Sequence, residues 1–366
     1  MKELIELVIK KKASDLHISV GLPPVLRIDG KLVQTEYEPL TPEDTKALIF
    51  SILTLEQRKI LEQRLELDCS YGIQGLGRFR VNAYKDRNGF AAALRTITSK
   101  IPTFEQLNLP KVCQQVCTKP RGLVLVTGPT GSGKSTTLAA MVGWINENRS
   151  DHILTIEDPI EYIHESKRSV VNQRELGADT HSFDNALRAA LREDPNVILI
   201  GEMRDLETIS LALKAAETGH LVFATLHTSS AAQTIDRVVD VFPPEQQQQI
   251  RIQLSNGLVA VFSQTLIPRL NQQGQIDGRV MAMEILVTTS GVANLIREGK
   301  TAQIYSAIQT GGRLGMVTLE NSLSDLVKRK LIRPEDALSK SSRPEDLEKL
   351  IAPELASAGI TTKLGQ

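Results

Sequence analysis

Gly128-Pro129-Thr130-Gly131-Ser132-Gly133-Lys134-Ser135, continued by Thr136, is the stretch that decides the fold of this chain. It fits G-x-x-x-x-G-K-[ST], the pattern of a phosphate-binding loop, at every fixed position. Its glycines allow a tight turn that points backbone N–H groups at phosphate oxygens. Lys134 is a cation for the β- and γ-phosphates, and the Ser135 hydroxyl suits a Mg²⁺ ion. The stretch therefore predicts a loop that binds ATP and Mg²⁺ through residues 128–136.

The residues on either side of this loop predict a strand before it and a helix after it. Leu123-Val124-Leu125-Val126 is a short apolar run that is typical of a buried strand. Leu138, Met141, Val142 and Ile145 then recur at helical spacing. This order favours a phosphate loop over a plain glycine-rich turn, because the positive end of the helix would face the bound anion.

Composition indicates a globular chain without a nucleic-acid signature. The 366 residues suggest two or three domains, and 41% hydrophobic with 23% charged residues are ordinary for a soluble protein. Lys+Arg and Asp+Glu are both 43 and aromatic content is 4%, so no nucleic-acid partner is expected. Three cysteines without metal-type spacing suggest a reducing compartment, with Cys113 and Cys117 as small buried residues of one helix face. Without a signal peptide or an apolar run of about 20 residues, the chain is expected to be cytoplasmic and to lack an integral membrane segment.

The N-terminal residues predict a small α+β domain. Strands are expected over residues 15–20, 25–28 and 31–33, with a hairpin turn at Asp29-Gly30. One helix is expected over residues 41–64. Strands mixed with helices in this way favour an α+β arrangement.

A second hairpin predicts three arginines on one sheet face. A strand with alternating polar and apolar residues precedes Asn88-Gly89, the strongest short hairpin turn in the chain. A two-residue turn sets Asn82 opposite Arg95, which puts Arg95 on the face of Arg78 and Arg80. Three guanidinium groups with no acidic residue between them suit an external anion, and a solvated sheet face is the alternative.

From about Lys111 onward, strand and helix patterns alternate, which predicts an α/β sheet. Apolar runs at 152–156, 197–200 and 221–226 are typical of its buried parallel strands. Residues 353–366 have little apolar pattern and are expected to lack regular structure.

Carboxylates follow two of these strands. Glu202 comes after the run at 197–200, and Glu157, Asp158 and Glu161 come at the end of the run at 152–156. Parallel sheets bind their ligands at the carboxyl ends of strands, and carboxylates gathered there need a cation or ordered water. Glu202 and Glu157 are therefore candidate ligands, with Ser135, of Mg²⁺.

Two histidines flank the third strand. His220 precedes the run at 221–226 and His227 follows it. A single histidine at a strand end is usually structural. For a pair of histidines that flank one strand, a functional role and a structural role are equally well supported.

With these segments assembled, the chain resembles the secretion ATPases of type II secretion and type IV pili over about residues 1–340. Four stretches carry the resemblance: residues 128–136 (Walker A loop), 155–161 (aspartate box), 191–205 (Walker B signature) and 219–227 (histidine box). Residues 13–17 and 77–82 resemble the N-terminal domain of the family. The resemblance implies a PAS-like α+β domain over residues 1–98, a linker over 99–110, and a RecA-like P-loop ATPase core with a helical C-terminal part over 111–366.

The resemblance also implies an ATP hydrolase that works as a hexamer, with the nucleotide between its two domains. Glu161 is then the general base and Glu202 the residue that orients Mg²⁺ or water, although these two roles are exchangeable. His227 would sense the γ-phosphate, and His220 would support its strand. The implied catalytic set is Lys134, Glu161, Glu202, Arg78, Arg80, Arg95, His227 and His220.

Two features bear on what such a motor does. No cysteine follows Cys117, so the four-cysteine zinc site of the extension and secretion motors of this family cannot form. This favours a motor for pilus retraction and twitching motility, peripheral at the inner membrane and partnered by an inner-membrane pilus platform protein. The segment Gly291–Glu298 matches only the second half of the retraction motif, Asn294–Glu298, so a pilus-assembly or secretion motor remains the alternative and a nucleic-acid motor a more distant one.

Overall fold

The computed structural model describes residues 1–28, 30–73, 76–97 and 100–358. The chain divides into two compact units. The first comprises Met1–Lys100, Pro159–Ile163 and Glu175–Asp179, and the second comprises Ile101–Asp158, His164–Arg174 and Thr180–Gln366. The predicted boundaries at residues 98 and 110 remain predictions, and residues 98 and 99 lie outside the described part. Among the described helices, none combines the length and the apolar character that crossing a membrane requires.

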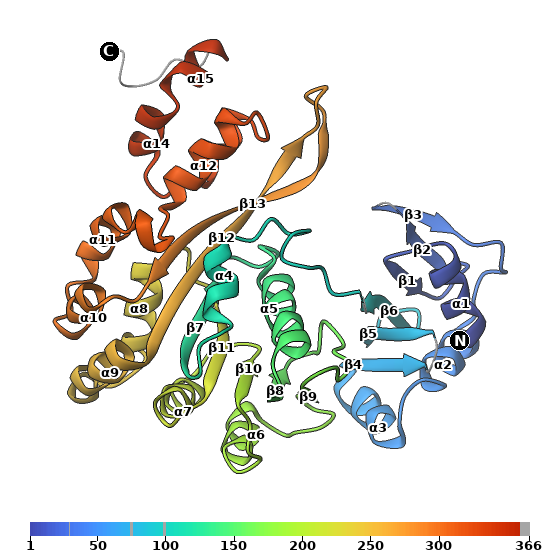
Figure 1. The fold of residues 1–366 in the computed structure, drawn as a ribbon. Coiled ribbons are helices and arrows are strands. Elements are labelled where there is room, and N and C mark those ends of the chain that lie inside the picture. Colours follow the sequence, from blue (N-terminus) through green and yellow to red (C-terminus); the bar gives the residue numbers. More distant parts are fainter. Residues whose placement is uncertain (29, 74–75, 98–99, 359–366) are drawn as a thin grey trace. The chain divides into compact units, whose positions relative to one another are not determined.

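The first unit is built on a six-stranded antiparallel sheet with the strand order β3-β2-β1-β6-β5-β4 (Figure 1). Its elements are α1 (Lys2–Lys10), β1 (Asp15–Ile18), β2 (Val25–Ile28), β3 (Lys31–Gln34), α2 (Pro42–Phe50), α3 (Leu55–Arg64), β4 (Glu66–Ile73), β5 (Gly77–Lys85) and β6 (Phe90–Ile97). Leu16, Phe79 and Leu94 are buried in its core with residues of the helices. The predicted α+β arrangement is therefore confirmed. The predicted turn at Asp29-Gly30 includes Asp29, which lies outside the described residues.

The single helix predicted over residues 41–64 is wrong, because two helices occupy this segment. The hydroxyl of Thr41 accepts a hydrogen bond from the Asp44 N–H, and the hydroxyl of Thr54 accepts one from the Gln57 N–H. In each case the side chain three residues on accepts from the N–H of the threonine, which completes a capping box. Two capping boxes define two helix starts, and the second one begins a new helix at Leu55, inside the segment predicted as one helix.

The second unit is built on a seven-stranded sheet with the order β13-β12-β7-β11-β10-β8-β9. The strand pairs from β12 to β8 are parallel, and β12 with β13 is antiparallel. Its elements are α4 (Lys111–Val116), β7 (Gly122–Thr127), α5 (Lys134–Asn148), β8 (His152–Glu157), β9 (Val170–Glu175), α6 (Phe183–Ala190), β10 (Val197–Ile200), α7 (Leu206–Glu217), β11 (Leu221–Leu226), α8 (Ala231–Asp240), α9 (Pro244–Gly257), β12 (Leu258–Leu270), β13 (Ile276–Val287), α10 (Ser290–Arg297), α11 (Ile304–Thr310), α12 (Leu319–Lys328), α13 (Pro334–Lys340), α14 (Pro344–Leu350) and α15 (Ala352–Ser357), with short 3-10 helices at Thr301–Gln303 and Gly312–Leu314.

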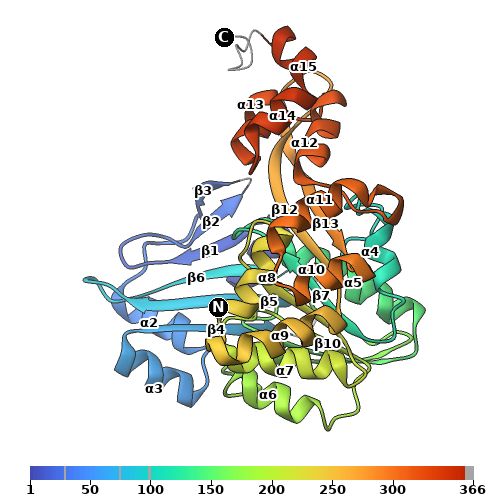
Figure 2. The same cartoon turned by 90° about the vertical axis from the view of Figure 1, so that its left-hand side faces the viewer.

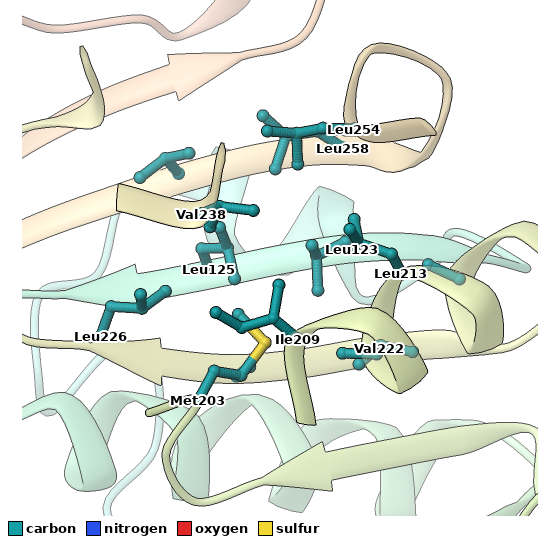
Figure 3. Packing of buried hydrophobic residues seen from close by; sticks show 14 of the residues in the cluster. Leu123, Leu125, Met203, Ile209, Leu213, Val222, Leu226, Val238, Leu254 and Leu258 are labelled. Atoms are coloured by element: carbon teal, nitrogen blue, oxygen red, sulfur yellow. The ribbon is translucent and has the colours of Figure 1, made fainter. Parts of the chain in front are cut away.

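Helices cover both faces of this sheet, because its central strands are apolar on both sides. Leu123 and Leu125 of β7 belong to a buried cluster with Ile209 of α7, and Figure 3 shows these side chains lying together. Val124 of the same strand points to the other face, where it belongs to a cluster with Met141 of α5. Because successive side chains of a strand point to opposite faces of the sheet, β7 contributes residues to two hydrophobic cores. The predicted α/β sheet is confirmed.

The last helices pack on the outer part of the β12–β13 hairpin (Figures 1 and 2). Ile267 of β12 and Ala282 of β13 share a buried cluster with Leu323 of α12 and Leu355 of α15. The prediction that residues 353–366 lack regular structure is wrong as far as Ser357, where α15 ends. Burial of Leu355 against neighbours distant in sequence provides the apolar contact that the local pattern did not reveal. Residues 359–366 lie outside the described part.

Candidate nucleotide-binding site

The phosphate loop joins the end of β7 to the start of α5, as predicted. Gly128, Gly131 and Gly133 have positive φ angles of 141°, 77° and 87°. These conformations favour glycine. A Cβ atom at Gly128 would lie 2.2 Å from the backbone oxygen of Gln264, whereas nothing lies within 4 Å of the position of a Cβ at Gly131. Gly128 is therefore required by a close backbone approach, and Gly131 by the turn alone. Pro129 and Thr130 are exposed at its tip, and Ser135 and Thr136 are half-buried in the first turn of α5.

Lys134 and Ser132 make this loop fit a phosphate group. The Lys134 ammonium group donates to the carbonyl oxygens of Gly128 at 2.9 Å and Pro129 at 3.2 Å, so its charge lies against the loop backbone. The Ser132 hydroxyl is buried and has no hydrogen-bond partner among the described residues. A buried hydroxyl without a partner is unusual, and a phosphate oxygen would provide one. The loop also precedes a helix of 15 residues, whose N-terminus attracts anions.

Glu202 and His227 meet at the carboxyl ends of two neighbouring strands. Glu202 follows β10, His227 follows β11, and β11 pairs with β7, the strand that enters the loop. The Nε2 atom of His227 lies 3.3 Å from Glu202 Oε1, and Arg204 pairs with Glu202 Oε2 at 2.8 Å. Burial acts to raise the pKa of Glu202, but the interactions with Arg204 and His227 outweigh burial and hold this pKa below its usual value. Glu202 is therefore a carboxylate at neutral pH.

Glu157 is the last residue of β8, which pairs with β10 on the side opposite to β11. It accepts hydrogen bonds from the Thr155 hydroxyl at 2.6 Å and from Nε2 of Gln173 at 3.2 Å. A Cβ at Gly201, the residue before Glu202, would lie 3.2 Å from the Glu157 Cα. The backbones that carry the two carboxylates therefore approach closely. In the described part of the chain no three His, Cys, Asp or Glu side chains cluster as metal ligands.

The three arginines share one face of the sheet in the first unit, but the predicted register is wrong. Arg80, and not Asn82, stands opposite Arg95. The carboxylate of Asp86 accepts hydrogen bonds from the N–H groups of Asn88 and Gly89, which stabilises a four-residue loop instead of a two-residue turn. Because the error is two residues, the side chains stay on the predicted face.

The prediction that no acidic residue lies between these arginines is also wrong. Arg95 pairs with Asp15 at 2.8 Å and Arg80 with Asp68 at 2.5 Å. Arg78 pairs at 3.0 Å with Glu175, a buried carboxylate of the same unit. These acidic partners lie outside the hairpin of β5 and β6, so the sequence of the hairpin does not reveal them. The side chain of Arg95 is still 72% exposed.

His220 lies away from the phosphate loop, and Glu161 belongs to the other compact unit. His220 precedes β11 at the opposite edge of the sheet from the loop, where its carbonyl oxygen accepts from the N–H of Gly122, the first residue of β7. Its Nδ1 atom lies 3.0 Å from the carbonyl oxygen of Ala215. His220 therefore supports the turn into β11, and we do not retain it as a catalytic side chain. Glu161 is exposed in Pro159–Ile163, a segment of the first unit, whereas Glu202 belongs to the second unit with the loop.

The local motifs did not reveal Gln264 of β12. Its side chain contacts both the loop and α5, and its backbone oxygen is the atom that requires glycine at position 128. The available signal was a short polar run, residues 263–265, that interrupts the apolar residues of one strand.

A mainly parallel sheet covered by helices on both faces, with a glycine loop between a central strand and a helix, defines a RecA-like P-loop ATPase. The chain belongs to the family "Type II/IV secretion system protein", whose model matches residues 1–322. The family expected from the four boxes is thus confirmed.

Several relatives match nearly the whole chain. It is 56% identical over 344 residues to "Type IV pilus retractation ATPase PilT" of Pseudomonas aeruginosa, which covers 94% of this chain and 98% of the relative. It is 51% identical over 324 residues to "Twitching motility protein" of Neisseria gonorrhoeae, covering 88% and 86%. The solved structure "Crystal Structure of the Pilus Retraction Motor PilT and Bound ADP" superposes with a TM-score of 0.88 at 50% identity, covering 95% of this chain and 98% of that one.

Proposed function

We propose that this protein is an ATP-driven motor that powers the retraction of type IV pili and thereby twitching motility. The observation that carries the proposal is the grouping of a phosphate loop with the Glu202–His227 pair on adjoining strands of one sheet. Identity of 56% over 94% of the chain to a relative named as a retraction ATPase supports the choice of retraction over assembly or secretion.

In this proposal the phosphates of ATP lie in the loop of residues 128–136. Lys134 exchanges its backbone acceptors for β- and γ-phosphate oxygens, and the Ser132 hydroxyl gains the partner that it lacks. Mg²⁺ would be held by Ser135 and by the carboxylates of Glu157 and Glu202, directly or through water. The metal would neutralise charge on the transferred phosphoryl group.

We assign the activation of water to Glu202 and Glu161. Glu202 is ionised and held by His227, so a change at the γ-phosphate that moves one of these side chains moves the other. Glu161 is proposed as the general base and Glu202 as the ligand of Mg²⁺ or of the water shell, and the reverse assignment stays open. Measuring single-turnover hydrolysis in Glu161→Gln and Glu202→Gln separates them, because only loss of the base abolishes the chemical step while Mg²⁺-dependent binding persists.

Arg78, Arg80 and Arg95 are proposed to stabilise charge on the phosphates, in the same or a neighbouring chain. Arg95→Ala should lower kcat about tenfold or more with little change in ADP affinity, because a residue that acts on transition-state charge contributes little to ground-state binding. Arg27→Ala is a matched control, since Arg27 lies 3.6 Å from the same carboxylate, Asp15. Equal losses of kcat in Arg95→Ala and Arg27→Ala would contradict a direct role of Arg95, because both variants remove an ion pair of Asp15.

We further propose that the working form is a homohexamer, peripheral at the cytoplasmic face of the inner membrane, with an inner-membrane pilus platform protein as partner. The names of the relatives, a pilus retraction ATPase and a pilus retraction motor, support the pilus as the place of action, and the family expected from the sequence motifs suggests the hexamer. Mass photometry with and without ATP tests the hexamer. A particle of one chain under all conditions would contradict it.

The deciding experiment joins enzymology to cell biology. Purified wild-type protein should hydrolyse ATP, and Lys134→Ala should lose activity about a hundredfold or more because it removes a charge from the transition state. A deletion strain should accumulate pili that do not retract, and wild-type protein, but not Lys134→Ala, should restore twitching. Loss of pili in the deletion strain would instead identify an assembly motor. Stimulation of hydrolysis by DNA would favour a nucleic-acid motor.

A further inference from the structure

The side chain of Gln264 joins the phosphate loop to the helix that follows it. Its Nε2 atom donates to the carbonyl oxygen of Ser132 at 2.7 Å, and its Oε1 atom accepts from the Thr137 hydroxyl at 3.0 Å. The residue is 3% exposed. Leaving a buried amide without its hydrogen-bond partners costs free energy. Gln264, Ser132 and Thr137 therefore constrain one another's positions.

The bond to Ser132 also determines where a neighbouring N–H group points. In a planar trans peptide, the carbonyl oxygen of Ser132 and the N–H of Gly133 lie on opposite sides. Gln264 holds this oxygen on the side of β12, so the N–H of Gly133 points away from β12. Gly133 takes the left-handed conformation at the N-terminal cap of α5, and a Cβ there would lie 3.2 Å from the Gln264 Nε2 atom. The amide therefore lies against the outer side of the turn whose inner N–H groups bind phosphate.

The backbone of the same residue constrains the start of the loop. The Gln264 carbonyl oxygen would lie 2.2 Å from a Cβ at Gly128, so β12 approaches the loop at both of its ends. The parallel pairing of β12 with β7 continues up to Ser263 and Thr127, immediately before these contacts. The register of strand pairing thus determines that Gln264 lies against the loop.

We propose that Gln264 is a positioning residue for nucleotide binding: its amide holds the Ser132–Gly133 peptide in the orientation that presents the Gly133 N–H to a phosphate group. Gln264 itself lies behind the loop and acts through Ser132 and Thr137. This inference rests on the proposed ATP site, because the loop needs a phosphate ligand for its orientation to matter.

The test compares the affinity of fluorescent ADP for four proteins. Gln264→Met keeps the length of the side chain and removes both hydrogen bonds, and Thr137→Val removes one. Gln253→Met is the control, since Gln253 is also a hydrogen-bonded glutamine, donating to Glu217 at 3.1 Å, but on α9 away from the loop. We expect ADP affinity to fall about tenfold or more in Gln264→Met, by a smaller factor in Thr137→Val, and to stay unchanged in the control.

Two readouts separate positioning from a general loss of stability. The rise in melting temperature on adding saturating ADP should shrink in Gln264→Met and not in Gln253→Met, and KM for ATP should rise more than kcat falls. If wild-type protein binds ADP and Gln264→Met binds it within twofold, the inference is wrong. If Gln264→Met does not fold, Thr137→Val decides, and wild-type affinity in that variant overturns the inference. If the wild-type protein itself binds no ADP, the proposed function has failed instead.

Discussion

Glu284 is a buried carboxyl group whose protonation should set part of the pH dependence of folding stability. It lies in β13 with 3% exposure, and its Oε1 atom accepts a hydrogen bond from the N–H of Ala231 at 2.7 Å. Burial raises the pKa of Glu284, and the charge of Glu320 raises it further, while the Ala231 hydrogen bond and Arg343 act in the opposite direction. The result is a pKa of about 7.

The sign of the effect follows from proton binding. A glutamate in an unfolded chain has a pKa of about 4.3, so between about pH 4.5 and pH 7 the unfolded state has released a proton that folded Glu284 retains. The unfolded state binds fewer protons in this window, and the free energy of unfolding therefore falls as pH rises. Above pH 7 both states are ionised and the decline stops. A shift of this size corresponds to about 3–4 kcal/mol of stability lost across the window.

Glu284→Gln isolates this contribution. Glutamine keeps an acceptor for the Ala231 N–H and never ionises. The variant should therefore match the wild type near pH 5 and exceed its free energy of unfolding by up to about 3–4 kcal/mol near pH 8. Urea titrations of both proteins from pH 5 to pH 8 measure the difference, from which the other titrating groups cancel. Glu335→Gln, an exposed glutamate of α13, is the control. A difference between Glu284→Gln and wild type that does not change with pH would refute the reasoning.

Two further predictions concern backbone space and thiol burial. Gly128→Ala should abolish ADP binding, because its Cβ would overlap the Gln264 backbone oxygen. Gly131→Ala should cost only about 1–2 kcal/mol of backbone strain and keep measurable binding, and equal affinities of the two variants in fluorescent ADP titrations would contradict this prediction. Burial raises the pKa of Cys113 to about 12 and raises that of Cys117 further. Neither thiol should therefore react with Ellman's reagent within minutes until urea unfolds the chain. Prompt reaction of either thiol at pH 8 would contradict this prediction and show that α4 opens in the native state.

Local sequence predicted the elements whose cause is itself local. The loop of residues 128–136, the apolar strands β7, β10 and β11, and the helix α5 follow from glycine chemistry and hydrophobic periodicity, and the structure places each where the patterns indicated. The burial of Cys113 and Cys117 was also predicted and is confirmed. The helix break at Thr54 also has a local cause, the capping box of Thr54 and Gln57.

Contacts between distant segments were not predictable in this way. Nothing in the hairpin of Arg80 and Arg95 indicates that Asp68 and Asp15 neutralise them, because those acids arrive on other strands. The carboxylates at strand ends could be predicted from the sheet rule, but the 3.3 Å contact of Glu202 with His227 depends on the strand order.

The sequence by itself determined that this chain has a phosphate loop on an α/β sheet, because a tight glycine turn and an apolar strand are properties of neighbouring residues. Only the tertiary structure decided which groups surround that loop. Gln264 reaches Ser132 and Thr137 because β12 pairs with β7 in one register, and His220 lies away from the loop because it precedes the strand that His227 follows. Strand order and register are set by the packing of the whole sheet, and no local pattern contains that information.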